Sequence, residues 1–483
     1  MGFIDKIQEK DLPDYQQQFS SRTMKNYVAQ ALVPFGTNSL SGMLFSSYLS
    51  FVYTQYLGVA ANVIAVIISI GIIVDGVTDF LMGFIVDRYR TKWGKAKHWF
   101  FISALPVGAT MVLMFMIPES TSQMAKAIYV FVMYNLFCTA LTTVRLPGGS
   151  LIALVSDSPK VHRNLAYIVE VASAFAGSTL GWIMAPMLSR YGDNLQTYRY
   201  ITFICGAITV IALLLIGLLT TEQRTKEDWI KYDEEYKKYS HQEKGETIFV
   251  QMKNLLSNKW WVILQLYNLA QACCMNFNFG VMAYWLALVV GDSSKVGMII
   301  AACSLPVTVG SLCYAPISRF FSSRKMIMLC RALQFVFGVI GWIAGAKHFS
   351  IYVMMLVPYS FLGGLVGPCS RVLIPQIIDY GEWKTGTRQE GLANSGTVVM
   401  NKIMAAVATS IVGFVLAASG YVGGNTVVNA GTISTINFLY LGVPTLMTLV
   451  SAVIMFFFRL DDKQVEQYKA EIAARNAALD KEA

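Results

Sequence analysis

The sequence predicts an all-helical membrane protein, and three observations lead to this prediction. Of its 483 residues, 55% are hydrophobic and only 14% are charged, whereas soluble domains carry about a quarter charged residues. The apolar residues gather in runs of the length that crosses a bilayer, about 20 residues of helix. The basic residues, which bring the formal net charge to +9, lie mainly between these runs. A water-soluble enzyme, a disordered chain and a nucleic-acid binder are therefore excluded.

Twelve apolar runs form two sets of six around a charged segment. We predict spans near residues 27–56, 61–87, 99–117, 124–155, 165–188 and 199–220, then near 260–290, 296–321, 326–346, 350–378, 392–419 and 433–458. The expected domains are an N-terminal segment 1–25, a first half 26–220, a linker 221–259, a second half 260–459 and a tail 460–483. Two six-helix halves are the plan of many secondary transporters.

Basic residues set the expected orientation. The segment between the second and third runs holds Arg88, Arg90, Lys92, Lys95 and Lys97, and further Lys and Arg follow the fourth, eighth and tenth runs. The opposite side carries few of them. The positive-inside rule places both termini and the linker in the cytoplasm. We expect the tail to be a polar, solvent-exposed helix, and we expect a monomer in the cell membrane.

The second run contains two carboxylates at helical spacing. Asp75 and Asp79 are four positions apart and Thr78 is three from Asp75, so the three side chains share one helix face. They fit a Na⁺ site of hard oxygen ligands, or a like-charge pair in which one carboxyl carries H⁺. The structural alternative is that both Asp only pair with basic residues to lock the bundle.

Two further buried charges lie in the fourth and fifth runs. Arg145 precedes Pro147-Gly148-Gly149, and Glu170 lies within the fifth run. An Arg145–Glu170 ion pair is one interpretation; contact of Arg145 with a carboxylate or sulfonate of the substrate is the other. The proline and two glycines are expected to break or bend the helix.

The second half has its own cations within apolar runs. Lys402 lies about three turns into the eleventh run, which favours a functional role. Arg371 follows Gly367-Pro368 and has an alternative role, in which it snorkels to the cytoplasmic interface.

Two longer motifs then suggest a family. The run DGVTDFLMGFIVDRYRTKWGK at 75–95 and the run DYGEWKTGTRQEG at 379–391 resemble signature segments of the glycoside–pentoside–hexuronide:cation symporters, within the major facilitator superfamily. The resemblance implies the major facilitator fold and uptake of a sugar or glycoside coupled to Na⁺ or H⁺, with no other cofactor.

The resemblance also assigns roles to residues. It implies a cation site at Asp75, Asp79, Thr78 and Thr142, with Lys402 near both cation and sugar. Salt bridges of the cytoplasmic loops would gate the transporter. The residues expected in this gate are Asp87, Arg88, Arg90, Glu382 and Arg388.

Several positions depart from the family pattern. Arg145 stands where the family has a sugar-binding Asp, Glu170 stands where it has an Arg, and Gly149 and Gly367 replace Trp. Asn38 falls where the family has an Asp in the first helix. We hypothesise an acidic substrate, a uronide or sulfo-sugar, met by Arg145, Lys402 and Arg371.

Other functions stay open at this point. A swapped Arg145–Glu170 pair also suits a neutral pentoside, xyloside or galactoside. A non-transporting membrane sensor is the alternative from a different class. A membrane enzyme is not expected, because the sequence offers no nucleophile–base or metal constellation. The expected partners are a small sugar or glycoside and the lipid bilayer.

Overall fold

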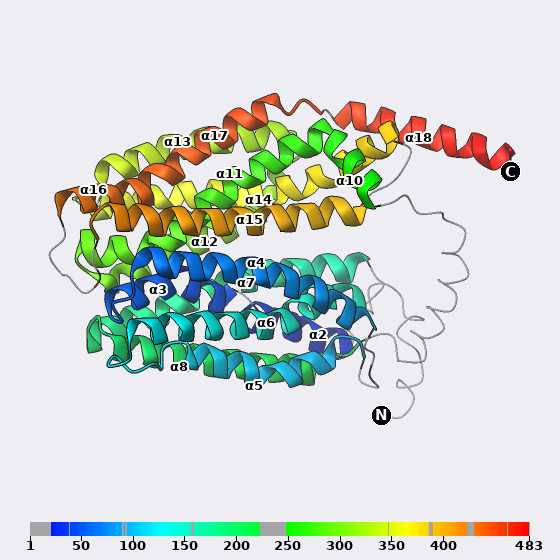
Figure 1. Cartoon of the computed structure of the whole chain (residues 1–483). Coiled ribbons are helices and arrows are strands. Elements are labelled where there is room, and N and C mark those ends of the chain that lie inside the picture. The colour runs from blue at the N-terminus through cyan, green and yellow to red at the C-terminus, as the bar shows by residue number, and fades with distance from the viewer. Residues whose placement is uncertain are drawn as a thin grey trace. The chain divides into compact units, whose positions relative to one another are not determined.

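The computed structural model describes residues 21–37, 39–88, 91, 94–155, 159–222, 248–345, 347–385, 390–421, 423, 429–460 and 462–482. Over these residues the regular secondary structure is helical, and β-pairing is limited to an isolated bridge between Thr91 and Gly94. The predicted all-α class is confirmed (Figure 1).

The chain forms two compact units. The first spans Met1–Glu243 and includes the short stretches Ser293–Ile300 and Val422–Asn425; the second holds the rest. The helices of the first unit are α2 (Ser21–Gly36), α3 (Ser39–Gln55), α4 (Ala61–Arg88), α5 (Lys97–Leu113), α6 (Gln123–Val155), α7 (Pro159–Tyr191) and α8 (Leu195–Leu219).

The second unit contains helices of more varied length, two of which continue into π-helices. They are α10 (Ile248–Ser257), α11 (Lys259–Tyr284) with the π-helix Trp285–Val290, α12 (Val296–Ile317), whose first turn belongs to the first unit, α13 (Ser323–Ala344), α14 (Phe349–Thr385), α15 (Glu390–Ala418), α16 (Ala430–Asn437) with the π-helix Phe438–Gly442, α17 (Val443–Phe457) and α18 (Asp462–Glu482).

Ten helices of the described chain are long and apolar enough to cross a membrane. The first and third predicted spans are not among them, because the first is divided between α2 and α3 and the third is the 17-residue α5. A count of twelve spans and the cytoplasmic position of the termini stay predictions.

The prediction of one continuous helix over 27–56 is wrong. Helix α2 ends at Gly36 and α3 begins at Ser39, and the Thr37 hydroxyl donates to the carbonyl of Val33 at 2.9 Å. Glycine and short polar residues favour helix ends over helix interiors. The break lies against α6, since a Cβ added at Gly148 would be 3.2 Å from Cγ2 of Thr37.

Small residues and capping side chains explain the close packing. In the first unit, a Cβ on Gly108 of α5 would lie 3.3 Å from the carbonyl oxygen of Gly206 on α8, and the converse holds for Gly206. Such small-residue contacts let membrane helices approach closely. In the second unit, Asn258 caps α11 by accepting from the N–H groups of Trp260 and Trp261 at 3.2 Å.

The tail is a helix as predicted, and most of its described side chains are exposed, but one side of it is packed. In α18, Val465 is buried, and the Tyr468 ring lies 4.5 Å from Trp383 and 5.6 Å from Tyr380 between centroids. Lys469 pairs with Asp379 at 3.3 Å. An aromatic residue in an otherwise polar helix thus docks α18 on the end of α14.

Candidate cation and substrate site

Helices α4 and α6 pack together in the first unit and bring four predicted residues to one place. Asp75 and Asp79 lie one turn apart on α4, and Thr142 and Arg145 lie three positions apart on α6. Residues at these spacings share a helix face. Two polar faces in apolar helices therefore meet, which satisfies charges that would be costly to leave alone in a membrane.

The guanidinium of Arg145 contacts both carboxylates. Its Nη2 lies 2.6 Å from each oxygen of Asp79 and 3.2 Å from Oδ2 of Asp75. Charge-assisted hydrogen bonds of this kind are about twice as strong as neutral ones. A single nitrogen thus holds three carboxylate oxygens.

The hydroxyl of Thr142 bridges the same pair. Its Oγ1 lies 3.1 Å from Oδ1 of Asp75 and 2.9 Å from Oδ1 of Asp79. A hydroxyl has one proton to donate, so it serves one carboxylate at a time. Thr78, the third predicted ligand, donates to the backbone carbonyl of Asp75 at 3.0 Å. Its oxygen keeps lone pairs for another partner.

The side chains of this cluster become more exposed from Asp75 through Asp79 to Arg145. The side chains of Asp75 and Asp79 are 12% and 17% exposed, whereas that of Arg145 is 31% exposed. The carboxylates are therefore more covered than the arginine, part of whose side chain remains accessible. The carboxylates offer oxygen ligands that suit a cation, and the guanidinium offers N–H donors that suit an anion.

The predicted Arg145–Glu170 ion pair is wrong. Arg145 forms its ion pairs with Asp75 and Asp79, because its place three residues after Thr142 turns it towards α4. Glu170 is partly buried in α7. The predicted break or bend at Pro147 is not a break, since α6 continues to Val155, and a bend stays a prediction.

The other predicted substrate residues have varied surroundings. Gly149 is exposed, and a Cβ there would meet nothing within 4 Å; the same holds for Gly367. In the second unit, Arg371 is exposed on α14 and Lys402 is partly buried on α15. Their approach to a substrate stays a prediction. Asn38 lies outside the described residues.

The predicted gate is only partly described. Arg90, Arg388 and the side chains of Asp87 and Arg88 lie outside the described residues. Glu382 is partly buried, and its carbonyl accepts from Nη2 of Arg475 on α18 at 3.3 Å. Salt bridges across this gate stay a prediction.

A carboxylate that was not predicted anchors the α4–α5 turn. Glu222, just after α8, accepts from the N–H groups of Lys95 at 2.7 Å and of Ala96 and Lys97 at 2.8 Å. Negative charge is favourable at such a helix start. Gly94 has φ +113°, and a Cβ there would collide with the Glu222 carboxylate. The turn that carries the first motif is therefore tied to the end of α8.

Sequence reasoning also missed a buried arginine in the second unit. Arg331 on α13 is 3% exposed. Its Nη2 donates to the Tyr267 hydroxyl at 3.0 Å, and its Nη1 donates to Oε1 of Gln334 at 2.7 Å. The sequence did contain the signal, a charged residue inside an apolar run, since position 331 falls within the predicted span 326–346.

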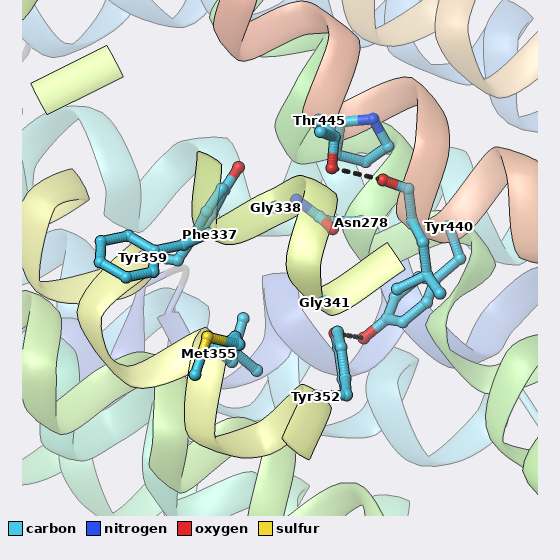
Figure 2. Close-up of a pocket in the computed structure, with 12 residues that line it drawn as sticks. Asn278, Phe337, Gly338, Gly341, Tyr352, Met355, Tyr359, Tyr440 and Thr445 are labelled. Atoms are coloured by element: carbon cyan, nitrogen blue, oxygen red, sulfur yellow. Dashed lines mark hydrogen bonds between the residues drawn. The ribbon is translucent and has the colours of Figure 1, made fainter. Parts of the chain in front are cut away.

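A pocket in the second unit lies on the face of α13 that also carries Arg331 and Gln334. Gly338 and Gly341 line it together with Tyr352, Tyr359 and Tyr440 (Figure 2). The Tyr352 hydroxyl donates to that of Tyr440 at 3.0 Å. Gln334, which accepts a hydrogen bond from Arg331, donates to the carbonyl of the pocket residue Tyr359 at 2.7 Å. Apart from these tyrosines the lining is largely apolar, and none of the predicted site residues lies in it.

Apolar helices of bilayer length around buried, paired charges define a class: a multi-pass membrane transport protein. Residues 32–462 match the family described as MFS/sugar transport protein, and the chain belongs to this family. It is a cell-membrane sugar transporter of the major facilitator superfamily, not an enzyme. The family that the two motifs predicted is confirmed.

The sequence similarity to known proteins covers nearly the whole chain. A putative glycoside/cation symporter of Escherichia coli is 24% identical over 89% of this chain and 91% of its own. The isoprimeverose transporter of Lactiplantibacillus pentosus is 24% identical, over 92% and 91%. A glucuronide carrier protein homolog of Escherichia coli is 23% identical, over 95% and 97%.

A solved structure supports the fold. The inward-open xylose transporter XylE of Escherichia coli superimposes with a TM-score of 0.63, at 12% identity, over 93% of this chain and 98% of that one. At this identity the likeness concerns the fold alone.

Proposed function

We propose that the chain is a symporter that takes up an acidic glycoside, a uronide or a sulfo-sugar, together with Na⁺ or H⁺. The observation that carries this proposal is the partly accessible side chain of Arg145, whose guanidinium is held by Asp75 and Asp79 in a membrane helix pair. A planar guanidinium recognises carboxylate and sulfonate groups through two parallel hydrogen bonds. A neutral sugar has no such group to offer.

The cation is proposed to bind at the carboxylate side of the cluster. Asp75, Asp79 and the hydroxyl oxygens of Thr78 and Thr142 form a set of hard oxygen ligands, which suits a cation such as Na⁺. Alternatively, one carboxyl takes up H⁺, because two adjacent carboxylates favour shared protonation. Both ions neutralise the same pair.

The substrate is proposed to lie near Gly148 and Gly149. The break between α2 and α3 contacts Gly148, and a Cβ added at Gly149 would meet open space. A ring placed there would be within the same region of α6 as Arg145, one turn away. Lys402 and Arg371 remain proposed contributors from the second unit.

A neutral glycoside is the second candidate. The match to the isoprimeverose transporter favours it, because its name gives a neutral sugar, while the match to the glucuronide carrier homolog favours the acidic one. In the neutral case Arg145 would only neutralise the two carboxylates, and its accessible part would have no ligand.

Uptake into proteoliposomes separates the two candidates. Radiolabelled phenyl glucuronide and a neutral xyloside are compared with and without Na⁺ at a fixed pH gradient. We expect glucuronide accumulation that is lost in Arg145→Gln and kept in Arg190→Gln, an exposed arginine at the end of α7. Accumulation of the xyloside alone would refute the acidic substrate.

A further inference from the structure

The Arg145 guanidinium contacts the two carboxylates that are proposed to bind the cation. Its Nη2 contacts both oxygens of Asp79 at 2.6 Å and one of Asp75 at 3.2 Å. These are charge-assisted hydrogen bonds, and a cation bound between the two carboxylates would use the same oxygen atoms. One place between the carboxylates cannot hold both groups.

We propose that Arg145 is a tethered competitor of the coupling cation, and that the acidic group of the substrate opens the cation site by taking Arg145 away. This inference rests on the proposed function and deepens it. In the empty transporter the guanidinium closes the site. When a carboxylate or sulfonate binds Arg145, the guanidinium leaves Asp79 and the cation replaces it.

The exchange couples the two ligands without a contact between them. A cation that enters an empty transporter must leave Arg145 without its carboxylate partners, which is unfavourable in a low-dielectric site. An anionic substrate supplies a new partner and removes that cost. By linkage, the cation then raises the affinity for the acidic substrate by the same factor as the substrate raises the affinity for the cation.

The rest of the cluster suits this exchange. The hydroxyl of Thr142 lies within hydrogen-bond distance of both carboxylates and donates to one of them at a time. It can turn a lone pair to the cation once the guanidinium has left. Arg145 is the most exposed member of the cluster, with 31% of its side chain accessible. It is therefore the member of the cluster that is most open to a ligand.

Cation binding to the purified full-length protein tests the competition directly. Na⁺ is titrated calorimetrically at fixed pH, and proton uptake or release is followed in weak buffer, for the wild type, Arg145→Gln, Arg145→Lys and Arg190→Gln. Without substrate, we expect Arg145→Gln to bind Na⁺ or H⁺ on the order of tenfold more tightly than the wild type. Arg145→Lys, which keeps the positive charge, should bind as weakly as the wild type.

The substrate arm tests the exchange. In the wild type, saturating phenyl glucuronide should raise cation affinity by about 5–150-fold, a neutral xyloside should leave it unchanged, and Arg145→Gln should lose the response. Unchanged or weaker cation binding in folded Arg145→Gln overturns the competitor role. If Arg145→Gln fails to fold, a wild-type cation affinity that glucuronide does not alter overturns it.

These outcomes differ from failure of the proposed function. If the wild type binds only the neutral glycoside, the acidic substrate is refuted. The substrate-free comparison of the wild type with Arg145→Gln would still decide whether Arg145 competes with the cation.

Discussion

Two arginines within apolar helices, one in each unit, have different partners. Arg145 contacts two carboxylates, and its side chain is 31% exposed. Arg331 is 3% exposed, and the contacts that the structure describes for it are with the neutral Tyr267 and Gln334. The Tyr267 ring also faces its guanidinium, 5.7 Å from Cζ to the ring centre.

From the difference in exposure and partners we infer which arginine can exchange its partners. The ion pairs of Arg145 are accessible and can be exchanged for an equivalent set with an anionic ligand. The hydrogen bonds of Arg331 are enclosed, and their loss would leave buried polar groups unpaired, which costs about 1–3 kcal/mol for each group. We therefore expect substitution of Arg145 to alter transport and substitution of Arg331 to alter stability.

The largest effect is expected from Asp79→Asn. An amide cannot neutralise Arg145 or bind a cation as a carboxylate does, so cation-driven accumulation should fall by about two orders of magnitude, the upper range of measured coupling. Uptake in proteoliposomes with and without the ion gradient measures it. Exposed Glu119 provides the control Glu119→Gln. Full accumulation by Asp79→Asn would remove Asp79 from the cation site.

An intermediate effect is expected from Arg331→Met. The apolar side chain fills a similar volume but leaves the Tyr267 hydroxyl and Gln334 without their donor. At about 1–3 kcal/mol for each of the two groups, the free energy of unfolding should fall by about 2–6 kcal/mol. Thermal unfolding in detergent measures the loss. Uptake per folded molecule, and its dependence on cation and substrate, should remain at the wild-type level. A selective loss of uptake at normal stability would contradict the structural role of Arg331.

The smallest effect is expected from Thr142→Val. It removes one hydroxyl from the cluster, and one hydrogen bond is worth about 0.5–1.5 kcal/mol, so cation affinity should fall by about two- to tenfold. Calorimetric titration of the cation measures it. Thr179→Val is the matched control, because that hydroxyl donates only to the Phe175 carbonyl at an exposed position. An equal change in both variants would show that Thr142 has no particular role.

Periodicity and spacing predicted much of the fold but not the contacts between helices. The four-residue spacing of Asp75 and Asp79 indicates a shared face in any helix, and α4 has that face. The partner of Arg145 depends on which helix packs against α6, and no local pattern specifies that. The prediction therefore had Glu170 as a possible partner, where the structure has Asp75 and Asp79.

Other features escaped prediction because single residues decide them. Arg331 lies inside the predicted span 326–346, but its neutral partner Tyr267 comes from packing that no local pattern specifies. The break at Thr37 lies in an apolar stretch whose average composition is that of a continuous span. Docking of α18 depends on Val465 and Tyr468 in a helix that is otherwise polar.

The Asp75–Asp79–Arg145 cluster carries one net negative charge in its ionised form, and this has an electrical consequence. Adding one monovalent cation and one monoanionic glycoside leaves that charge unchanged, so the loaded and empty transporters cross the membrane field with equal charge. The membrane potential then cannot drive accumulation, and only the concentration gradient of the cation does. With a neutral glycoside the loaded form would carry one more positive charge, and each 100 mV would contribute about 2.3 kcal/mol to uptake.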